Sequence, residues 1–218
     1  MQSSQKPRPA KKDLWFNAGR YFLRTVKRED ASDRWAGWLA DPWTTHALNS
    51  APRKMTKGDI AEYIRKFDQR SHLLLGIFER GTRLHVGFIR LDLDDNKREA
   101  FVSAVIGEPE HRNRGATTDV FVPLLDFLFD TAGIDRIRAS ILDRNRLTLS
   151  YLLKMGWQQD PEPEAPVKSF GDGTPLERWS VSWTRDGYRS FRTTALGRRI
   201  LQRLQAERPA RRGPAREG

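Results

Sequence analysis

The sequence predicts one α+β domain built on a mixed, mostly antiparallel twisted sheet with flanking helices. Length and composition allow a packed core, because 38% of the 218 residues are hydrophobic, with eleven Phe and seven Trp. Runs with the composition of strands alternate with segments of helical apolar spacing. Their order, β-α-α-β-β-β-α-β-α-β, favours a mixed sheet over a doubly wound one.

The first elements are a strand and two helices. Residues 21–26 combine aromatic and β-branched side chains, as strands do. Asp30 or Ser32 can cap a short helix, which Asp41–Pro42 should stop. Thr56 then opens a second helix with one apolar face. That face consists of Ile60, Tyr63, Ile64 and Phe67.

Three strands and a long helix follow. The runs 72–79, 83–92 and 98–107 are separated by short turn sequences, which predicts an antiparallel meander. A polar loop over residues 108–114 then leads into an amphipathic helix from about 115 to 129.

The last third of the chain predicts two strands and two helices. Residues 136–142 form a strand, and Leu147–Met155 form a helix that a glycine terminates. Four prolines within 161–175 predict a loop. Residues 176–183 alternate as a final strand, and 188–205 have the pattern of a basic amphipathic helix.

The formal net charge of +11 is concentrated at the two ends of the chain. Residues 1–12 carry four basic side chains and no acid, and residues 185–218 carry ten Arg and three acids. Residues 13–184 are therefore formally neutral. We expect a disordered basic tail over 1–12, one folded domain over 13–184, and a basic C-terminal helix and tail over 185–218. Such ends are either simply solvated or make salt-dependent contacts with RNA, the ribosome or anionic lipid.

Composition excludes several classes of site. The chain has no Cys, which removes disulfides and thiolate chemistry and is compatible with a reducing cytoplasm. Its four His are not paired at ligand spacing, so we expect no metal site. No apolar run approaches the roughly eighteen residues of a membrane span, and no secretory signal is indicated. We therefore expect a cytoplasmic protein.

The junction between the 98–107 strand and the next helix carries most of the functional information. Such a loop turns consecutive backbone N–H groups toward the positive end of the helix dipole, which suits a pyrophosphate. Gly115 permits close approach to the backbone, and Arg112 and Arg114 can reach phosphate oxygens, unless they are only solvated loop charges. The loop matches neither a Walker A motif nor G-x-G-x-x-G.

Two motifs in this half of the chain resemble the GNAT (GCN5-related N-acetyltransferase) family. Arg112-x-x-Gly115-x-Thr117 is similar to the family's Arg/Gln-x-x-Gly-x-Gly/Ala loop, and Asn145-x-x-Thr148…Lys154-Met-Gly156-Trp157 to its Asn-x-x-Ser/Ala…Lys-x-Gly-Phe block. The resemblance covers roughly residues 20–183. The Trp38-x-x-Asp41-Pro42 pattern resembles the branch that contains ribosomal-protein N-terminal and amino-sugar N-acetyltransferases.

The resemblance implies a GNAT fold and acetyl-CoA as the acyl donor. It implies that the loop amides hold the pyrophosphate and that the strand around Val105 and Ile106 splays from its neighbour to bind the pantetheine amides. Asn145 would contact the cofactor arm, although Asn is also a good helix cap. The expected cofactor-binding residues are Val105, Ile106, Arg112, Asn113, Arg114, Gly115, Ala116, Thr117, Thr118, Asn145 and Thr148.

Two positions depart from the family pattern. Thr117 replaces the usual Gly or Ala, and Leu152 stands where many relatives have a general-acid Tyr. Tyr151 is one residue earlier, about 100° around the helix, and Ser150 is the other polar candidate.

The expected chemistry is attack of a neutral primary amine on the thioester, with the oxyanion held by a strand amide near Ile106 or Gly107. Glu108 is the preferred base, with Glu110 and His111 as alternatives, unless Glu108 only balances the loop arginines. The candidate catalytic residues are Glu108, Ser150 and Tyr151.

Aromatic and hydroxyl side chains of the early helices lie, by resemblance, on the acceptor side. Trp38, Trp43 and Thr45 are expected to stack on and hydrogen-bond a sugar or nucleobase, with core packing as the alternative for Trp38. The expected acceptor is therefore an amino-sugar nucleotide. The alternatives are N-terminal acetylation of a ribosomal or other protein and a non-catalytic acyl-CoA-binding module, and a homodimer is left open.

Overall fold

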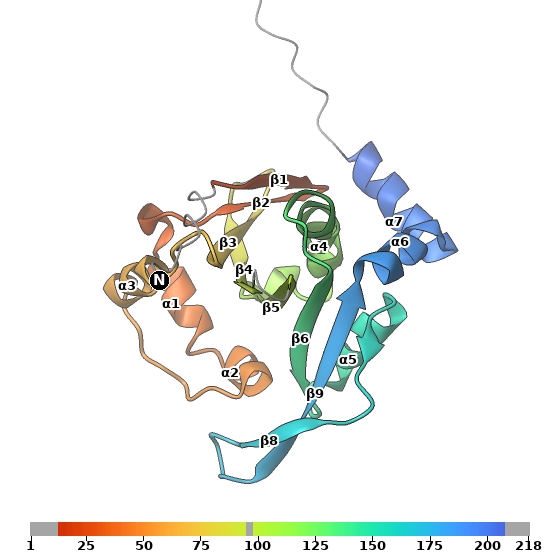
Figure 1. The fold of residues 1–218 in the computed structure, drawn as a ribbon. Helices are drawn as coiled ribbons and strands as arrows, with labels where there is room; N and C mark the ends of the chain where they lie inside the picture. Colours follow the sequence, from red (N-terminus) through yellow and green to blue (C-terminus); the bar gives the residue numbers. More distant parts are fainter. Residues whose placement is uncertain (1–12, 95–97, 208–218) are drawn as a thin grey trace, which may run out of the picture.

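One mixed sheet of nine strands runs through the part of the chain that this computed structural model describes, residues 13–94 and 98–207 (Figure 1). The strand order is β1-β2-β3-β4-β5-β6-β9-β7, and β8 also pairs with β9. Among these strands only β5 and β6 pair in parallel, which confirms the predicted α+β class. The strands are β1 (Trp15–Ala18), β2 (Tyr21–Thr25), β3 (His72–Glu79), β4 (His85–Asp94), β5 (Glu99–Ile106), β6 (Arg136–Leu142), β7 (Gln158–Gln159), β8 (Glu164–Lys168) and β9 (Pro175–Thr184).

The helices lie on both faces of this sheet. Figure 1 shows the three early helices on one side of the central strands and α4 on the other. The helices are α1 (Asp33–Trp38), α2 (Pro42–Leu48), α3 (Lys57–Arg65), α4 (Ala116–Asp126), α5 (Arg146–Lys154), α6 (Arg185–Thr193) and α7 (Ala195–Ala206). A π-helical turn, Phe127–Thr131, continues α4.

The strands separate two apolar cores because successive side chains point to opposite faces. Leu73, Leu75 and Ile77 of β3 enter the larger core, which α4 and the C-terminal helices cover. Leu74 enters the smaller core beneath α1 and α3, where Trp35 is fully buried.

Two elements near the N-terminus differ from the sequence expectation. β1 pairs with β2 in a hairpin, and its four residues are too few for a readable period. Pro42 begins a further helix, α2, rather than only ending α1. Asp41 caps α2 through its side chain, and proline at the first helical position has no N–H to leave unpaired.

Two elements near the C-terminus also differ. The proline-rich segment contains β8, an edge strand where proline is tolerated. The expected single helix over 188–205 is instead two, because Thr194 ends α6 and caps α7. The pair packs closely: a Cβ on Gly197 would come within 2.1 Å of the Phe191 carbonyl oxygen.

The basic C-terminal segment is thus largely part of the folded body. Tyr188 and Phe191 of α6 and Ile200 and Leu204 of α7 are buried in the larger core. The expected basic tail at residues 1–12, and the chain beyond residue 207, lie outside the described residues.

Candidate active site

β5 and β6 diverge at the centre of the sheet. They pair in parallel over only three positions, the last being Phe101 with Arg138. Beyond this point β5 stays paired with β4 as far as Ile106, so its other edge has no strand partner. The family resemblance implies such a divergence around Val105 and Ile106.

The hydrogen-bond pattern of β4 and β5 determines which backbone groups face the gap. The N–H of Gly107 donates to the carbonyl of Val86 at 2.9 Å, and groups alternate along an antiparallel strand. The backbone groups of Ala104 and Ile106 therefore point toward β6, whereas those of Val105 bond to β4. The Ile106 carbonyl accepts from Arg112 Nε at 3.1 Å, so the N–H of Ile106 is the group with the geometry expected for a pantetheine contact. The side chain of Val105 instead packs in the smaller core.

The loop before α4 presents a run of free backbone donors. Within the described residues, none of the N–H groups from Asn113 to Thr118 has a hydrogen-bond acceptor. The run is bracketed by Arg112, whose N–H donates to Pro109, and Asp119, whose N–H donates to Gly115. These donors lie at the positive end of the α4 dipole, where a diphosphate is stabilised. We refer to residues 113–118 as the cradle.

Gly115 keeps the cradle open. Its φ of 81° is in the left-handed region, which favours glycine. A Cβ added there would meet no atom of the chain within 4 Å. The space beside Gly115 is therefore open, as the predicted pyrophosphate contact requires.

Arg112 does not occupy the position that the sequence predicts. Its guanidinium donates to Asp41 at 2.9 Å and to the carbonyl of Gly107 at 2.6 Å, and lies 4.4 Å from the centre of the Trp43 ring. The side chain ties the loop to the start of α2, so its position does not support the predicted phosphate contact. Arg114 is exposed and makes no ion pair in the described chain, which leaves it able to reach a phosphate.

Glu108 is held in place by α1. One carboxylate oxygen accepts from Trp38 Nε1 and the other from Arg34, each at 2.8 Å, and the residue is 7% exposed. Its partner is thus neither of the loop arginines that the sequence suggests. Because each oxygen already accepts a hydrogen bond from α1, the geometry does not support the selection of Glu108 as general base.

Two of the three predicted acceptor contacts are wrong. Trp38 is 4% exposed and packs so closely beneath the loop that a Cβ on Gly107 would come within 2.0 Å of its ring. Thr45 is 6% exposed, and its hydroxyl donates to the backbone carbonyls of Asp41 and Pro42. Trp43 is 53% exposed and remains available to a ligand.

Asn145 immediately precedes α5, at the N-cap position, but its side chain does not cap the helix. Its side chain makes no cap hydrogen bond, so the helix-cap explanation for this residue is wrong. The side chain is half-buried and has no partner in the described structure, which suits a contact with the cofactor arm. Thr148, one turn later, is also half-buried.

The two polar candidates on α5 do not converge on the gap. The hydroxyls of Tyr151 and Thr118 are hydrogen-bonded at 2.5 Å, which joins α5 to α4. Burial raises the pKa of Tyr151, so its hydroxyl stays protonated at neutral pH. Either hydroxyl can be the donor in this pair, so Tyr151 could give its proton to a substrate only while Thr118 donates to it. Ser150 lies on the exposed face of α5.

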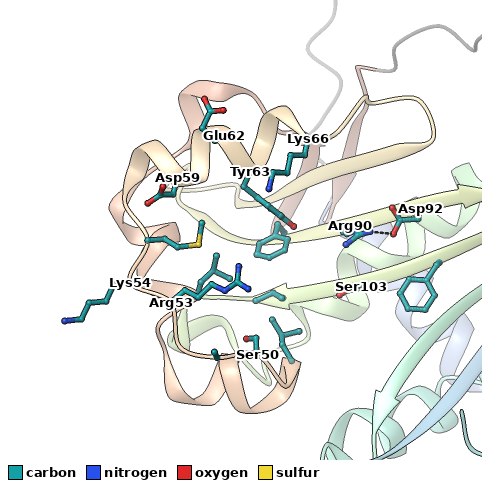
Figure 2. A pocket seen from close by; sticks show the side chains of 17 residues that line it. Ser50, Arg53, Lys54, Asp59, Glu62, Tyr63, Lys66, Arg90, Asp92 and Ser103 are labelled. Carbon is teal, nitrogen blue, oxygen red and sulfur yellow. Dashed lines mark ion pairs between the residues drawn. The ribbon is translucent and has the colours of Figure 1, made fainter. Parts of the chain in front are cut away.

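A cavity of about 880 Å³ lies between α3, the segment before it and the faces of β4 and β5 (Figure 2). Phe88 and Val105 form part of its apolar wall, beside the partly exposed ring of Phe101. Val105 thus lines this cavity while its neighbour Ile106 faces the gap, so the cavity adjoins the diverging strands. We refer to it as the acceptor cavity.

Three cations of the acceptor cavity have no carboxylate partner in the described residues: Arg53, Lys54 and Lys66. Figure 2 shows Arg53 reaching into the cavity and Lys54 pointing away from it. Sequence reasoning missed all three. A pair of adjacent basic residues between two helices was the available signal, but it did not show that Lys66 would line the same cavity.

The carboxylates of the acceptor cavity are all engaged. Asp59 accepts from the N–H and hydroxyl of Thr56, which lowers its pKa. Glu62 pairs with Arg65. Asp92 accepts from His72 and Arg90, at 2.7 and 2.8 Å. Asp59 has no cationic partner among the described residues, so three unpaired cations stand against one unpaired carboxylate and the excess charge of the cavity is positive.

No helix within residues 13–94 and 98–207 is both long and apolar enough to cross a membrane.

Comparison with known proteins identifies the family. The family model described as "Acetyltransferase (GNAT) domain" matches residues 20–158. An uncharacterized N-acetyltransferase of Bacillus subtilis, YoaA, is 26% identical over 161 residues, which cover 72% of this chain and 89% of that protein.

Solved structures show the same fold at low sequence identity. A spermidine N-acetyltransferase from Vibrio cholerae, in complex with CoA and spermine, is 15% identical with a TM-score of 0.67, covering 78% of this chain and 98% of its own. A ribosomal-protein-S5-alanine acetyltransferase from Vibrio fischeri is 16% identical with a TM-score of 0.64, covering 81% and 99%. FdhC, a nucleotide-linked sugar GNAT, is 18% identical with a TM-score of 0.67, covering 85% and 98%. With the family model spanning more than half of the sequence, the chain belongs to the GNAT family of acetyltransferases and is an acetyl-CoA-dependent acyltransferase.

Proposed function

We propose that this enzyme acetylates the primary amine of an amino sugar that is linked to a nucleotide. The observation that carries the proposal is the unpaired positive charge of the acceptor cavity beside an apolar wall. A nucleotide diphosphate would supply the anion and a nucleobase the flat apolar surface.

The donor side of the proposal rests on the cradle and the free edge of β5. The cradle donors would hold the pyrophosphate of acetyl-CoA, and the backbone of Ile106 and Ala104 would bind the pantetheine amides. The side chain of Asn145 would contact the cofactor arm. Bound acetyl-CoA supplies an activated acetyl thioester. The chain fixes this group at the open end of the gap.

The acceptor side rests on Arg53 and Lys66. A guanidinium that reaches into the cavity without a carboxylate can bind a diphosphate by two parallel hydrogen bonds, and an ammonium adds a point charge. Trp43, exposed at the start of α2, offers a further stacking surface. A polyamine, the acceptor of the Vibrio cholerae protein, would instead bring cations toward a cavity in which unpaired cations outnumber unpaired carboxylates.

Proximity is the main catalytic contribution in this proposal. Glu108 is engaged by α1, and the cavity carboxylates are engaged by their own neighbours. Holding amine and thioester in a reactive geometry can lower a barrier by about 7–11 kcal/mol without a strong base.

Initial rates of thiol release with a panel of amines test the proposal. The panel contains a nucleoside-diphosphate amino sugar, the free amino sugar, spermidine and a ribosomal-protein N-terminal peptide. We expect the highest kcat/KM with the nucleotide sugar. Arg53→Ala should raise KM for that substrate about tenfold, since one charge-assisted contact is worth about 1.5–3 kcal/mol, and leave the free sugar unchanged.

Lys54→Ala is the matched control, because Lys54 is the adjacent cation and points away from the cavity. Equal effects of the two substitutions would contradict the assignment of Arg53. A higher kcat/KM with the peptide would favour N-terminal protein acetylation. Turnover of none of the amines would contradict the proposed acceptor class.

Several finer expectations stay predictions. A cytoplasmic location stays a prediction, a homodimer stays open, and contact of the basic ends with RNA or the ribosome belongs to the alternative of protein N-terminal acetylation. The predicted RNA contact falls partly on residues 1–12 and 208–218, outside the described chain.

A further inference from the structure

Helix α7 meets α4 at a buried carboxylate. Asp119 of α4 is 1% exposed, and its Oδ1 accepts from Arg203 of α7 at 2.5 Å. Burial raises the pKa of Asp119, and the hydrogen bond and charge of Arg203 oppose this effect. Arg203 therefore stabilises a negative charge that would be costly to bury unpaired.

This carboxylate belongs to the first turn of the cofactor helix. The N–H of Asp119 donates to the carbonyl of Gly115, the glycine within the cradle. At 1.5 Å per residue, the two residues are separated by about 6 Å along the helix axis. An uncompensated charge on Asp119 would therefore repel a diphosphate in the cradle.

A second carboxylate, that of Glu207, adds to the negative charge that Arg203 must neutralise. Glu207 Oε1 lies 3.7 Å from the Arg203 guanidinium, and its negative charge also raises the pKa of Asp119. The other oxygen of Glu207 is buried and has no hydrogen-bond partner among the described residues. Arg20 faces Asp119 as a further cation, and the Tyr151 hydroxyl lies close to the pair.

We propose that Arg203 is a positioning residue for acetyl-CoA, which neutralises Asp119 so that the cradle can accept a diphosphate. The basic C-terminal helix is then a working part of the donor site, although it lies beyond residues 20–158 that the family model matches. The inference rests on the donor site of the proposed function and is independent of the identity of the acceptor.

Binding of two ligands to Arg203→Gln separates this role from a merely structural one. Titration calorimetry with acetyl-CoA at pH 8 should show a Kd about tenfold higher than for the unaltered chain. This is the effect expected when one unneutralised negative charge repels the diphosphate from roughly 8–10 Å. NMR titration with S-acetylpantetheine, which lacks the diphosphate, should show no change. Arg198→Gln is the control, because Arg198 is an exposed arginine of α7 without a carboxylate partner in the described chain.

Asp119→Asn provides an arm that does not depend on the stability of Arg203→Gln. Alone it should leave the affinity for acetyl-CoA unchanged or raise it, and combined with Arg203→Gln it should restore the original affinity. Equal weakening of both ligands, no weakening of either, or failure of the double variant to restore binding would overturn the proposal. Absence of acetyl-CoA binding by the unaltered chain would instead contradict the donor site itself.

Discussion

Gly115→Val tests the cradle with the least disturbance of the fold. The backbone at Gly115 has a φ of 81°, and an added Cβ would meet no atom of the chain within 4 Å. The substitution should therefore reduce the stability of the folded protein only through backbone strain, whereas a bound diphosphate would meet a branched side chain in front of the N–H donors.

The two costs differ enough to be separated. A non-glycine residue in the left-handed region loses roughly 1–2 kcal/mol of stability. Hydrogen bonds to charged groups contribute about 1.5–3 kcal/mol each. Losing only two cradle contacts would therefore cost at least about 3 kcal/mol of binding, which raises the Kd for acetyl-CoA more than about a hundredfold.

Gly133→Val is the matched control. Gly133 has a φ of 73° and also has nothing within 4 Å of an added Cβ, but it lies beyond the other end of α4. Chemical unfolding should show similar losses of stability for the two variants. Calorimetry should show weakened acetyl-CoA binding for Gly115→Val alone. An unchanged Kd in that variant would refute the cradle.

Three further substitutions address individual side chains. Asn145→Ala should raise the Kd for acetyl-CoA several-fold at an unchanged melting temperature, because the side chain makes no cap hydrogen bond; the reverse result would restore the capping explanation. Glu108→Gln should lower stability by about 1–3 kcal/mol in urea unfolding, because it weakens two hydrogen bonds to a buried carboxylate, with little change in kcat; a loss of kcat of several orders of magnitude would identify a base after all. Burial and the positive charge of Arg24 lower the pKa of His85 to about 4, although the negative charge of Asp30 raises it in part. The unfolded chain then binds a proton below about pH 6.5 that the native chain does not, so stability should fall by about 2 kcal/mol between pH 7 and 5. His85→Phe should lose less stability over this interval, and an identical loss in both proteins would contradict the burial effect.

Local pattern predicted most of the fold. β3 and β6 begin and end at the expected residues, and Thr56 caps α3 as expected, because strand composition and capping depend on residues near in sequence. The cradle could be predicted for the same reason. The short hairpin strand β1 could not, since its four residues carry no period of their own.

Side-chain partners from distant segments could not be predicted. Arg112 has the right spacing for a phosphate ligand, but Asp41, which lies 71 residues away in sequence, captures its guanidinium. Trp38 engages Glu108 across 70 residues and is buried by that contact. Arg53 and Lys66 share a cavity only because α3 packs over β4 and β5.

The alternation of a single strand explains how donor and acceptor meet. The side chains of Phe101, Ser103 and Val105 line the acceptor cavity, whereas the backbone groups of Ala104 and Ile106 face the donor gap. In the proposed function, β5 therefore presents its face to the acceptor and its free edge to acetyl-CoA, so that their reactive ends would meet where the gap opens. Such an arrangement makes approach geometry the main source of rate, and for that reason the engaged carboxylates around the site are compatible with catalysis.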